Sequence, residues 1–263
     1  MNKTALITGA SRGIGLELAK IFAKNACNLV ITARSADKLI ELKTELESKH
    51  QIEVYVIVKD LSLQQSPKEI YDELKEKSIN IDYLVNNAGF GKYGMLHESD
   101  SNIETAMINV NINAVTILTK LFIKDMIKRG SGRIMNLSSL AAFQPGPLMA
   151  VYFASKSFVL SFSEAVNNEV REFGVTVTAL CPGPTRSGFL QNAKLEKSRL
   201  FKGSNIALAA DVALFGYKAM MKGKPVAIHG FLNYFLANSS RFVTRNFAIK
   251  VTRYKMNSSK KMK

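Results

Sequence analysis

The sequence predicts an α/β fold in which helices cover both faces of a doubly wound, seven-stranded parallel sheet, followed by a basic helical extension. Short β-branched runs alternate with longer segments of helical period along most of the chain. The runs are apolar without a break, as at residues 54–58, which is typical of strands buried on both faces. No Pro/Gly/Ser-rich linker, low-complexity tract or internal repeat interrupts the alternation.

The predicted elements follow one another in strict alternation. The strands are expected at 3–8, 28–32, 53–58, 82–86, 133–137, 175–180 and 225–228. The helices are expected at 13–26, 36–49, 67–78, 102–129, 150–173 and 205–222. The helix at 67–78 is highly charged and is expected at the surface, whereas the helix at 150–173 is apolar nearly all round. Because no linker, low-complexity tract or repeat divides these elements, we interpret residues 1–230 as one domain and 231–263 as a basic amphipathic extension.

The positive charge of the chain is concentrated at its C-terminal end. The net charge is +15, yet residues 1–196 carry 22 basic and 20 acidic side chains, and residues 197–263 carry 14 basic and one acidic, Asp211. This distribution excludes a nucleic-acid-binding domain that is basic throughout. A hydrophobic content of 47%, with 15 Phe, excludes disorder across the chain. Two cysteines, Cys27 and Cys181, are too few for a disulfide framework and predict buried thiols in a reducing compartment.

A glycine-containing turn follows the first strand and opens the first helix. It reads Thr8-Gly9-Ala10-Ser11-Arg12-Gly13-Ile14-Gly15, a T-G-x-x-x-G-x-G spacing. Glycines allow a tight turn and close approach of the backbone, and a helix N-terminus attracts a phosphate. As a bare glycine pattern it also fits a simple strand-helix turn. Its position after the first strand favours a dinucleotide site.

Tyr152 and Lys156 lie at i and i+4, on one face of the predicted helix 150–173. A neighbouring cation stabilises a phenolate, so this pairing suits a tyrosine that exchanges a proton. Two other Y-x-x-x-K matches exist, at Tyr55 and at Tyr71. The first lies along a strand and the second on a charged surface helix. Only Tyr152 follows a strand that ends in hydroxyls, Ser138-Ser139.

Together these motifs resemble the short-chain dehydrogenase/reductase family. The residues that carry the resemblance are, in family order, Thr8–Gly15, Asp60, Asn86-Asn87-Ala88-Gly89, Asn111, Ser139, Tyr152, Lys156 and Pro182-Gly183. The series covers about residues 3–230. It implies a Rossmann fold with a combined dinucleotide-binding and catalytic domain, and an oxidoreductase that transfers a hydride between a nicotinamide cofactor and a carbonyl or secondary alcohol. No metal site is expected.

The resemblance implies a role for each matched residue. Tyr152 would be the proton donor or acceptor, and Ser139 would polarise the substrate carbonyl. Lys156 would hold the nicotinamide ribose and lower the pKa of Tyr152. Asn111 would position a water that relays protons to Lys156, although Asn109 and Asn113 leave the register open by two residues. The cofactor-binding residues would be Gly9, Ser11, Arg12, Gly13, Ile14, Gly15, Arg34, Asp60, Leu61, Asn87, Ala88, Gly89, Tyr152, Lys156, Pro182, Gly183, Thr185 and Ser187.

The residues after the second strand favour NADP(H) over NAD(H). The sequence there is Thr32-Ala33-Arg34-Ser35, with no carboxylate to accept from a ribose 2′-hydroxyl. Arg34 and Arg12 are able to grip a 2′-phosphate through charge-assisted hydrogen bonds. Alternatively, either arginine is simply solvated. Later in the chain, the family's P-G-x-x-x-T pattern ends here in Ser187, which keeps the hydroxyl.

Apolar and aromatic residues dominate the segments that would line the substrate side. They are Phe90, Tyr93, Met95, Phe143, Leu148, Met149, Phe189, Leu190, Leu200 and Phe201. Such a wall suits a lipophilic ketone, such as a 3-oxoacyl or steroid-like compound. An equal alternative is that half of these residues pack the core. A rival of another class is a non-catalytic NADP-binding sensor or scaffold that keeps the fold without turnover.

The extension from residue 231 departs from shorter members of the family. Val243, Phe247, Val251 and Tyr254 form one stripe of an expected helix between 241 and 256, with basic residues opposite. The extension is interpreted as lying on an anionic membrane, as capping the substrate pocket or packing on the body, or, least favoured, as binding nucleic acid. No signal peptide and no run of apolar residues long enough for a membrane span is apparent, so a cytoplasmic, membrane-peripheral protein is expected. The family resemblance implies a homodimer through helices 102–129 and 150–173.

Overall fold

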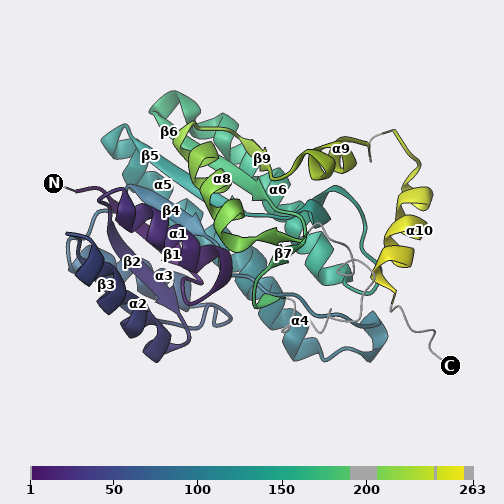
Figure 1. The fold of residues 1–263 in the computed structure, drawn as a ribbon, viewed down its shortest axis with the longest axis horizontal. Helices are drawn as coiled ribbons and strands as arrows, with labels where there is room; N and C mark the ends of the chain where they lie inside the picture. The colour runs from purple at the N-terminus through teal and green to yellow at the C-terminus, as the bar shows by residue number, and fades with distance from the viewer. Residues whose placement is uncertain (1, 190–205, 240–241, 258–263) are drawn as a thin grey trace.

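The computed structural model describes residues 2–189, 206–239 and 242–257, and it contains the predicted seven-stranded parallel sheet (Figure 1). The strands are β1 (Thr4–Thr8), β2 (Asn28–Ala33), β3 (Val54–Val58), β4 (Tyr83–Asn86), β5 (Gly132–Leu137), β6 (Val175–Cys181) and β9 (Val226–Ile228). They are arranged in the order β3-β2-β1-β4-β5-β6-β9, and every neighbouring pair is parallel. The predicted fold class is confirmed.

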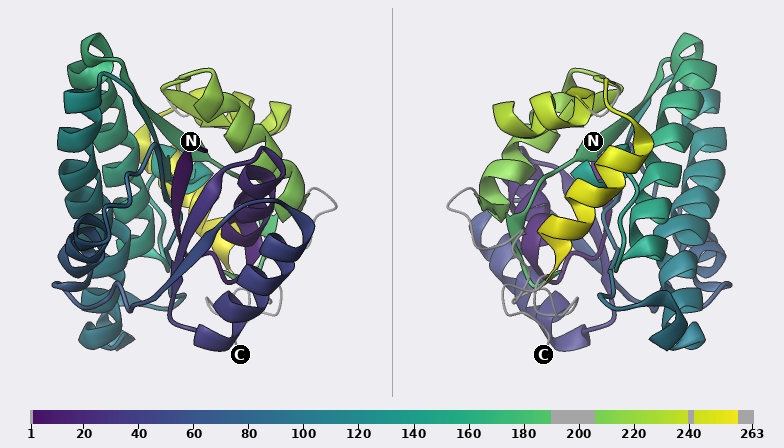
Figure 2. Two further views of the ribbon diagram at one scale, coloured as in Figure 1. Left: turned by 90° about the vertical axis from the view of Figure 1, so that its left-hand side faces the viewer. Right: turned by 90° about the vertical axis from the view of Figure 1, so that its right-hand side faces the viewer.

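Helices cover both faces of the sheet, as Figure 2 shows. The helices of the body are α1 (Gly13–Lys24), α2 (Ala36–Lys49), α3 (Ser66–Glu76), α4 (Ser101–Ile108), α5 (Val115–Arg129), α6 (Ala150–Val170) and α8 (Ala209–Met221). Side chains of β1 alternate between two cores, because successive residues of a strand point to opposite faces. Ala5 and Ile7 pack with α1, α2 and α8, whereas Leu6 packs with α3 and α5.

The strand order reverses between β1 and β4, which places a crevice at the carboxyl ends of these strands. The turn after β1 and the segment after β4 lie on either side of this crevice. Hydrogen bonds join the two segments: the amides of Asn87 and Ala88 each donate to Thr8 Oγ1, at 3.0 Å. The fold therefore brings the glycine turn and the Asn-Asn-Ala-Gly segment to one place.

The long helix expected at 102–129 is divided by a π-helical stretch, Asn109–Ala114, between α4 and α5. A π-turn inserts one extra residue into a helix and is frequent at functional sites. The segment Ser101–Arg129 contains an 18-residue window with a mean hydropathy of 1.5, so it is long and apolar enough to cross a membrane, contrary to the expectation that no stretch is. Half of that window is buried, and α5 contributes Leu118, Phe122 and Met126 to the core. Packing on the sheet accounts for the buried half of the window.

Two further features differ from the sequence-based expectation. The helix expected from 205 begins at Ala209, because Ala207–Leu208 (β8) pairs with Thr185–Arg186 (β7) in a small second sheet. The extension forms two helices, α9 (Phe231–Ser239) and α10 (Arg245–Met256), and only the second was expected. Both lie at the carboxyl-end side of the sheet, away from the N-terminus (Figure 1). Both cysteines are free and buried, as expected.

Candidate active site

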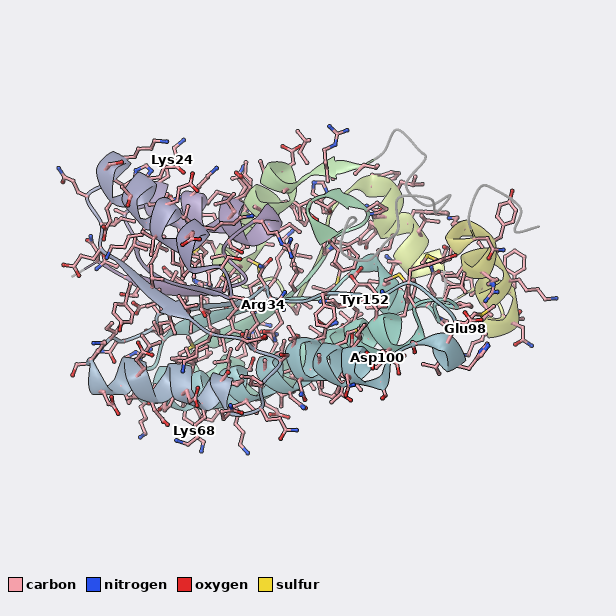
Figure 3. All side chains as sticks on the ribbon, turned by 90° about the horizontal axis from the view of Figure 1, so that it is seen from below. Lys24, Arg34, Lys68, Glu98, Asp100 and Tyr152 are labelled. Atoms are coloured by element: carbon pink, nitrogen blue, oxygen red, sulfur yellow. The ribbon has the colours of Figure 1, made fainter. Side chains whose placement is uncertain are left out.

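A cavity of about 630 Å³ lies at the carboxyl ends of the strands and brings together most of the predicted site residues. Those that line it are Gly9, Ser11, Arg12, Gly13, Ile14, Arg34, Asp60, Leu61, Asn87, Ala88, Gly89, Ser139, Tyr152, Lys156, Pro182, Gly183, Thr185 and Ser187. Gly15 and Asn111 do not line it and lie behind its wall. In Figure 3, Arg34 and Tyr152 both lie between the helical layers, with Tyr152 nearer to α10.

The glycine turn is fixed by the side chain of Asn87. Asn87 Nδ2 donates to the carbonyls of Thr8, at 2.8 Å, and Gly9, at 3.1 Å. Gly9 has φ of +68°, which favours glycine, and a Cβ on Gly15 would overlap both Asn87 Nδ2 and the Gly9 carbonyl. The turn therefore presents bare backbone to the cavity, as close approach of a pyrophosphate requires.

Tyr152 and Ser139 form the polar centre of the cavity. Ser139 follows β5 and caps a short 3-10 helix, Leu140–Phe143, by accepting from the Ala141 amide at 3.1 Å. Burial raises the pKa of Tyr152 to about 12, and a hydrogen bond with the Ser139 side chain opposes that rise. The phenol is therefore neutral and protonated near pH 7. It is suited to give a proton to an oxygen that gains negative charge.

Lys156 lies one helical turn beyond Tyr152 and is 4% exposed. Its ammonium donates to the Leu137 carbonyl at 2.7 Å and lies 5.8 Å from the centroid of the Tyr152 ring. Burial lowers the pKa of Lys156 to about 8. The expected lowering of the Tyr152 pKa by this cation is not seen, because the pKa of Tyr152 is raised and Lys156 is not among its causes. Desolvation of the phenol outweighs the effect of an ammonium that is turned toward the strand.

Asn111 is the asparagine of the π-helical stretch that lies beside the site. Its Nδ2 donates to the Phe90 carbonyl and to Ser155 Oγ, both at 3.0 Å, and its Oδ1 accepts from the Phe90 amide at 3.1 Å. Asn111 Oδ1 and Lys156 Nζ both lie against Gly89, at 3.1 and 3.3 Å from where a Cβ would be. Asn109 instead donates to the Ser62 carbonyl and accepts from Asn113. The geometry thus separates Asn111 from its two neighbours in the sequence.

The end of the cavity beside β2 and β3 is rich in cations. Arg34 is 70% exposed and lies 3.9 Å from an Asp60 oxygen, a loose ion pair. Lys38 and Lys59 also line this end, together with Ser35. The sequence reasoning missed these three residues. Lys38 lies one turn after Arg34 at the start of α2, and that spacing was the available signal. These cations and Arg12 suit an additional phosphate better than a bare ribose hydroxyl.

The other end of the cavity is apolar and includes a residue of the extension. Leu148, Met149, Phe153 and Met256 form a buried cluster, with Tyr93, Met95, Tyr152 and Phe189 packed against it. Thr252, Lys255 and Met256 of α10 line the cavity, which the sequence reasoning did not assign to particular residues. Phe143 packs instead with Ala142 and Leu160 in a separate core cluster, so its expected place in the substrate wall is wrong. Leu190, Leu200 and Phe201 lie outside the described residues.

Within the described part of the chain, no group of three or more His, Cys, Asp or Glu side chains is placed to hold a metal ion. Apart from the single carboxylate of Asp60, the polar groups that the cavity offers are hydroxyls, amides and ammonium or guanidinium cations. These groups bind phosphates and sugar hydroxyls and exchange protons, but they are poor metal ligands.

Residues 3–198 match the family model described as short chain dehydrogenase. Among curated relatives, the chain is 34% identical over 188 residues to a very-long-chain 3-oxoacyl-CoA reductase of Macaca fascicularis, covering 69% of this chain and 59% of the reductase. It is 35% identical over 186 residues to mouse 17-beta-hydroxysteroid dehydrogenase type 3, covering 69% of this chain and 60% of that protein. The match therefore spans about three fifths of the length of these two relatives.

A solved structure is similar over nearly the whole chain. It is a short-chain dehydrogenase from Sphingobium yanoikuyae in complex with NADPH, at 27% identity with a TM-score of 0.82. The superposition covers 91% of this chain and 94% of that chain. The similarity extends past the matched family region into the C-terminal part.

Proposed function

This chain belongs to the short-chain dehydrogenase family, and we propose that it is an oxidoreductase that interconverts a ketone and the matching secondary alcohol. The observation that carries the proposal is the placement of Tyr152, Ser139 and Lys156 in the middle of a cavity that has a cationic end and an apolar end. A protonated phenol beside a hydroxyl is the arrangement that a carbonyl oxygen needs as it is reduced.

Different residues of the chain would carry out different parts of the reaction. A nicotinamide dinucleotide bound along the cavity would supply or accept the hydride. Ser139 would hydrogen-bond the substrate oxygen and orient it toward Tyr152, which would donate its proton in reduction and accept one in oxidation. Lys156, with a pKa of about 8, would exchange protons with water near neutral pH. Asn111 would position the water that connects Lys156 to solvent, and Lys156 would also hold the ribose hydroxyls.

We propose NADP(H) as the preferred cofactor. Arg34, Lys38 and Lys59 form a cationic end of the cavity, and only Asp60 among its lining residues there is acidic. A second phosphate would be held by charge-assisted hydrogen bonds from these side chains and Arg12. The similar structure from Sphingobium yanoikuyae was solved with NADPH, which agrees with this preference.

The proposed substrate is a lipophilic ketone, such as a 3-oxoacyl or steroid-like compound. Support comes from the apolar cluster of Leu148, Met149, Phe153 and Met256, which adjoins Tyr152 and offers shape rather than polar anchors. Two relatives are named for acting on a 3-oxoacyl-CoA and a hydroxysteroid, both with large apolar parts. We further propose a cytoplasmic homodimer that pairs through α4, α5 and α6, where Phe158 is 40% exposed and stacks on Phe162.

The alternative function is a cofactor-binding sensor or scaffold without turnover. The two proposals differ in the effect of Tyr152→Phe, which removes only the phenolic hydroxyl. We expect purified protein to oxidise NADPH with a panel of 3-oxoacyl thioesters and steroid ketones, and Tyr152→Phe to lower kcat by about 10²–10⁴-fold. NADPH affinity, measured by fluorescence titration, is expected to be retained.

Tyr71→Phe is the matched control for this experiment. Tyr71 stands in the same Y-x-x-x-K spacing, but its hydroxyl donates to Asp125, and neither residue lines the cavity. Its turnover is expected to equal that of the parent. Tight NADPH binding with no turnover of any ketone or alcohol in the panel would favour the sensor instead.

A further inference from the structure

The extension exposes large apolar side chains to an unusual degree. Nine of the eighteen large hydrophobic residues exposed in the described chain lie between residues 231 and 254. Phe231 is 89% exposed and Phe242 is 88% exposed. Scattered exposed hydrophobic residues are normal, but a contiguous group on neighbouring elements marks an interaction surface. We use the name docking surface for the outward side of α9 and α10 together with Phe242 between them; it is represented by Phe231, Phe235, Phe242, Phe247, Val251 and Tyr254.

Helix α10 has one face that packs on the body and another that is exposed. Ala248, Thr252 and Met256, at successive i+4 positions, are buried against the body, and Thr252 and Met256 line the catalytic cavity. Phe247, Val251 and Tyr254 are exposed on the outward side. The apolar stripe expected from the sequence is therefore not the face that packs on the body. The small and flexible side chains pack inward, and the aromatic stripe is left facing outward.

Helix α9 is also held by one face only. Ala237 is buried, and Asn233 packs against Gly183 of the cavity wall while donating to the His229 carbonyl at 2.7 Å. Phe231 and Phe235 remain exposed. Both helices lie at the same end of the molecule and form its outer boundary there (Figures 1 and 2). The docking surface is thus a protruding one, and it is fixed to the cavity wall from behind.

The charge around the docking surface has one sign. Arg245 and Lys250 are exposed on α10, whereas Arg253 on its last turn contacts Met95 of the body and Lys255 lines the cavity. The sequence contains no Asp or Glu after Asp211. A second copy of the chain, paired across a two-fold axis, would present the same cations to themselves and be repelled. Apolar side chains mixed with cations instead complement the boundary between acyl chains and anionic headgroups.

We propose that α9 and α10 dock the protein on the surface of an anionic phospholipid bilayer. The exposed aromatic side chains would enter the headgroup region, and Arg245 and Lys250 would pair with lipid phosphates. Because the inner face of α10 lines the catalytic cavity, docking would set that wall of the cavity against the lipid. A lipophilic ketone dissolved in the bilayer would then reach the cavity over a short path. This last consequence rests on the proposed function, whereas the docking itself does not.

The test uses the full chain and two kinds of vesicle. Binding is measured by co-sedimentation with phosphatidylcholine vesicles and with vesicles of phosphatidylcholine mixed with phosphatidylglycerol. We expect binding to the mixed vesicles, weaker binding to the neutral ones, and loss of the difference at high salt. In Arg245→Glu/Lys250→Glu, partition to the mixed vesicles should fall at least about tenfold. In Phe242→Ser/Phe247→Ser, binding to both kinds of vesicle should fall.

Matched controls carry the same changes elsewhere on the surface. Lys24→Glu on α1 and Ile40→Ser on α2 alter an exposed cation and an exposed apolar side chain, and both should bind as the parent does. Turnover of a water-soluble ketone without vesicles should be unchanged in the docking variants, because none of the substituted residues lines the cavity. A fall in that turnover would reveal damaged folding, and single substitutions at the same positions would then replace the pairs.

The outcomes separate docking from the proposed function. Vesicle binding without turnover of any ketone would leave docking in place and remove the enzyme proposal. Turnover with no vesicle binding, or with equal binding in parent and docking variants, would overturn docking. If the parent sedimented as a larger oligomer and Phe242→Ser/Phe247→Ser dissociated it, the docking surface would be a contact between copies of the chain. That result would also overturn the proposal of membrane docking.

Discussion

Lys156 Nζ donates a 2.7 Å hydrogen bond to the carbonyl of Leu137, the last residue of β5. The bond ties the second turn of α6 to the end of the strand, and Ser138 Oγ adds a return bond to the Lys156 carbonyl at 2.8 Å. It places a cation in a site that is 4% exposed, where burial removes its hydration and one carbonyl accepts a hydrogen bond from it. The lowered pKa of Lys156, about 8, is the consequence.

This arrangement predicts a specific dependence of stability on pH. The unfolded chain holds the Lys156 proton up to about pH 10.5, whereas the folded chain releases it near pH 8. The unfolded state thus binds more protons between these values, and the free energy of unfolding rises with pH in this window. For Lys156 the rise is at most about 3 kcal/mol. Urea unfolding at pH 7 and pH 10 should show this rise in the parent but not in Lys156→Met.

Other groups titrate in the same range, so the difference between parent and variant is the quantity to compare. Burial raises the pKa values of Tyr152 and Cys181 to about 12, and each of these makes stability fall as pH rises above its unfolded value. Both groups are present in both proteins, so the difference removes their effect apart from the influence of the Lys156 charge on the pKa of Cys181, which is the smallest of the causes acting on that thiol. Parallel curves for the parent and Lys156→Met would show that the buried ammonium is not destabilising.

Ser139→Ala should raise the pKa of Tyr152 further and lower kcat. The Ser139 hydrogen bond opposes the effect of burial on the phenol, so its loss leaves desolvation unopposed. We expect kcat to fall by about 10²-fold or more, and the alkaline limit of the reductive rate to move to higher pH. Ser139→Thr, which keeps a hydroxyl, should recover much of the rate. If Ser139→Ala lowered only the thermal stability, because the Ala141 amide loses its acceptor, then Ser139 would cap the 3-10 helix and have no role in catalysis.

The sheet and the location of the site follow from local patterns in the sequence. Apolar runs such as 54–58 and 175–181 need burial on both sides, and only a covered parallel sheet provides it. Because parallel strands end at one edge, the residues after β1, β4, β5 and β6 had to meet there. This edge could be predicted as the location of the site, and the family motifs then identified most of its residues, although Ser35, Lys38 and Lys59 were missed.

Other features depend on which of several possible tertiary contacts forms, and the pattern of residue types along the chain does not determine this. The π-helical stretch around Asn111 is held by bonds to Phe90 and Ser155, which are 21 and 44 residues away in the chain. The orientation of α10 is set by the fit of Met256 among Leu148, Met149 and Phe153 rather than by its own apolar stripe. The pKa of Tyr152 depends on how deeply the ring is buried and where the Lys156 ammonium points. None of these three features can be predicted from the spacing of residue types along the chain.

Gly15→Ala should weaken cofactor binding and stability together. A Cβ at this position would overlap Asn87 Nδ2 and the Gly9 carbonyl, so the turn or the Asn87 side chain must move. Overpacking of this kind costs about 1–3 kcal/mol, measured by urea unfolding. Gly130→Ala is the control, because no other atom lies within 4 Å of its Cβ, although its φ of +66° is strained for alanine. Gly130→Ala should lose some stability and keep the NADPH affinity of the parent. If Gly15→Ala bound NADPH as tightly as Gly130→Ala does, the glycine turn would not contribute to cofactor binding.

Arg34→Ala should discriminate between the two nicotinamide cofactors. The guanidinium is 70% exposed and only loosely paired with Asp60 at 3.9 Å, so it is available to a ligand at little cost. Loss of a charge-assisted contact with a 2′-phosphate should raise KM for NADPH by about tenfold or more and leave KM for NADH nearly unchanged. Lys43→Ala, which removes an exposed cation of α2 that does not line the cavity, should alter neither KM. Equal efficiency with both cofactors, in the parent and in Arg34→Ala alike, would show that Arg34 is merely solvated and that the cationic end does not select NADP(H).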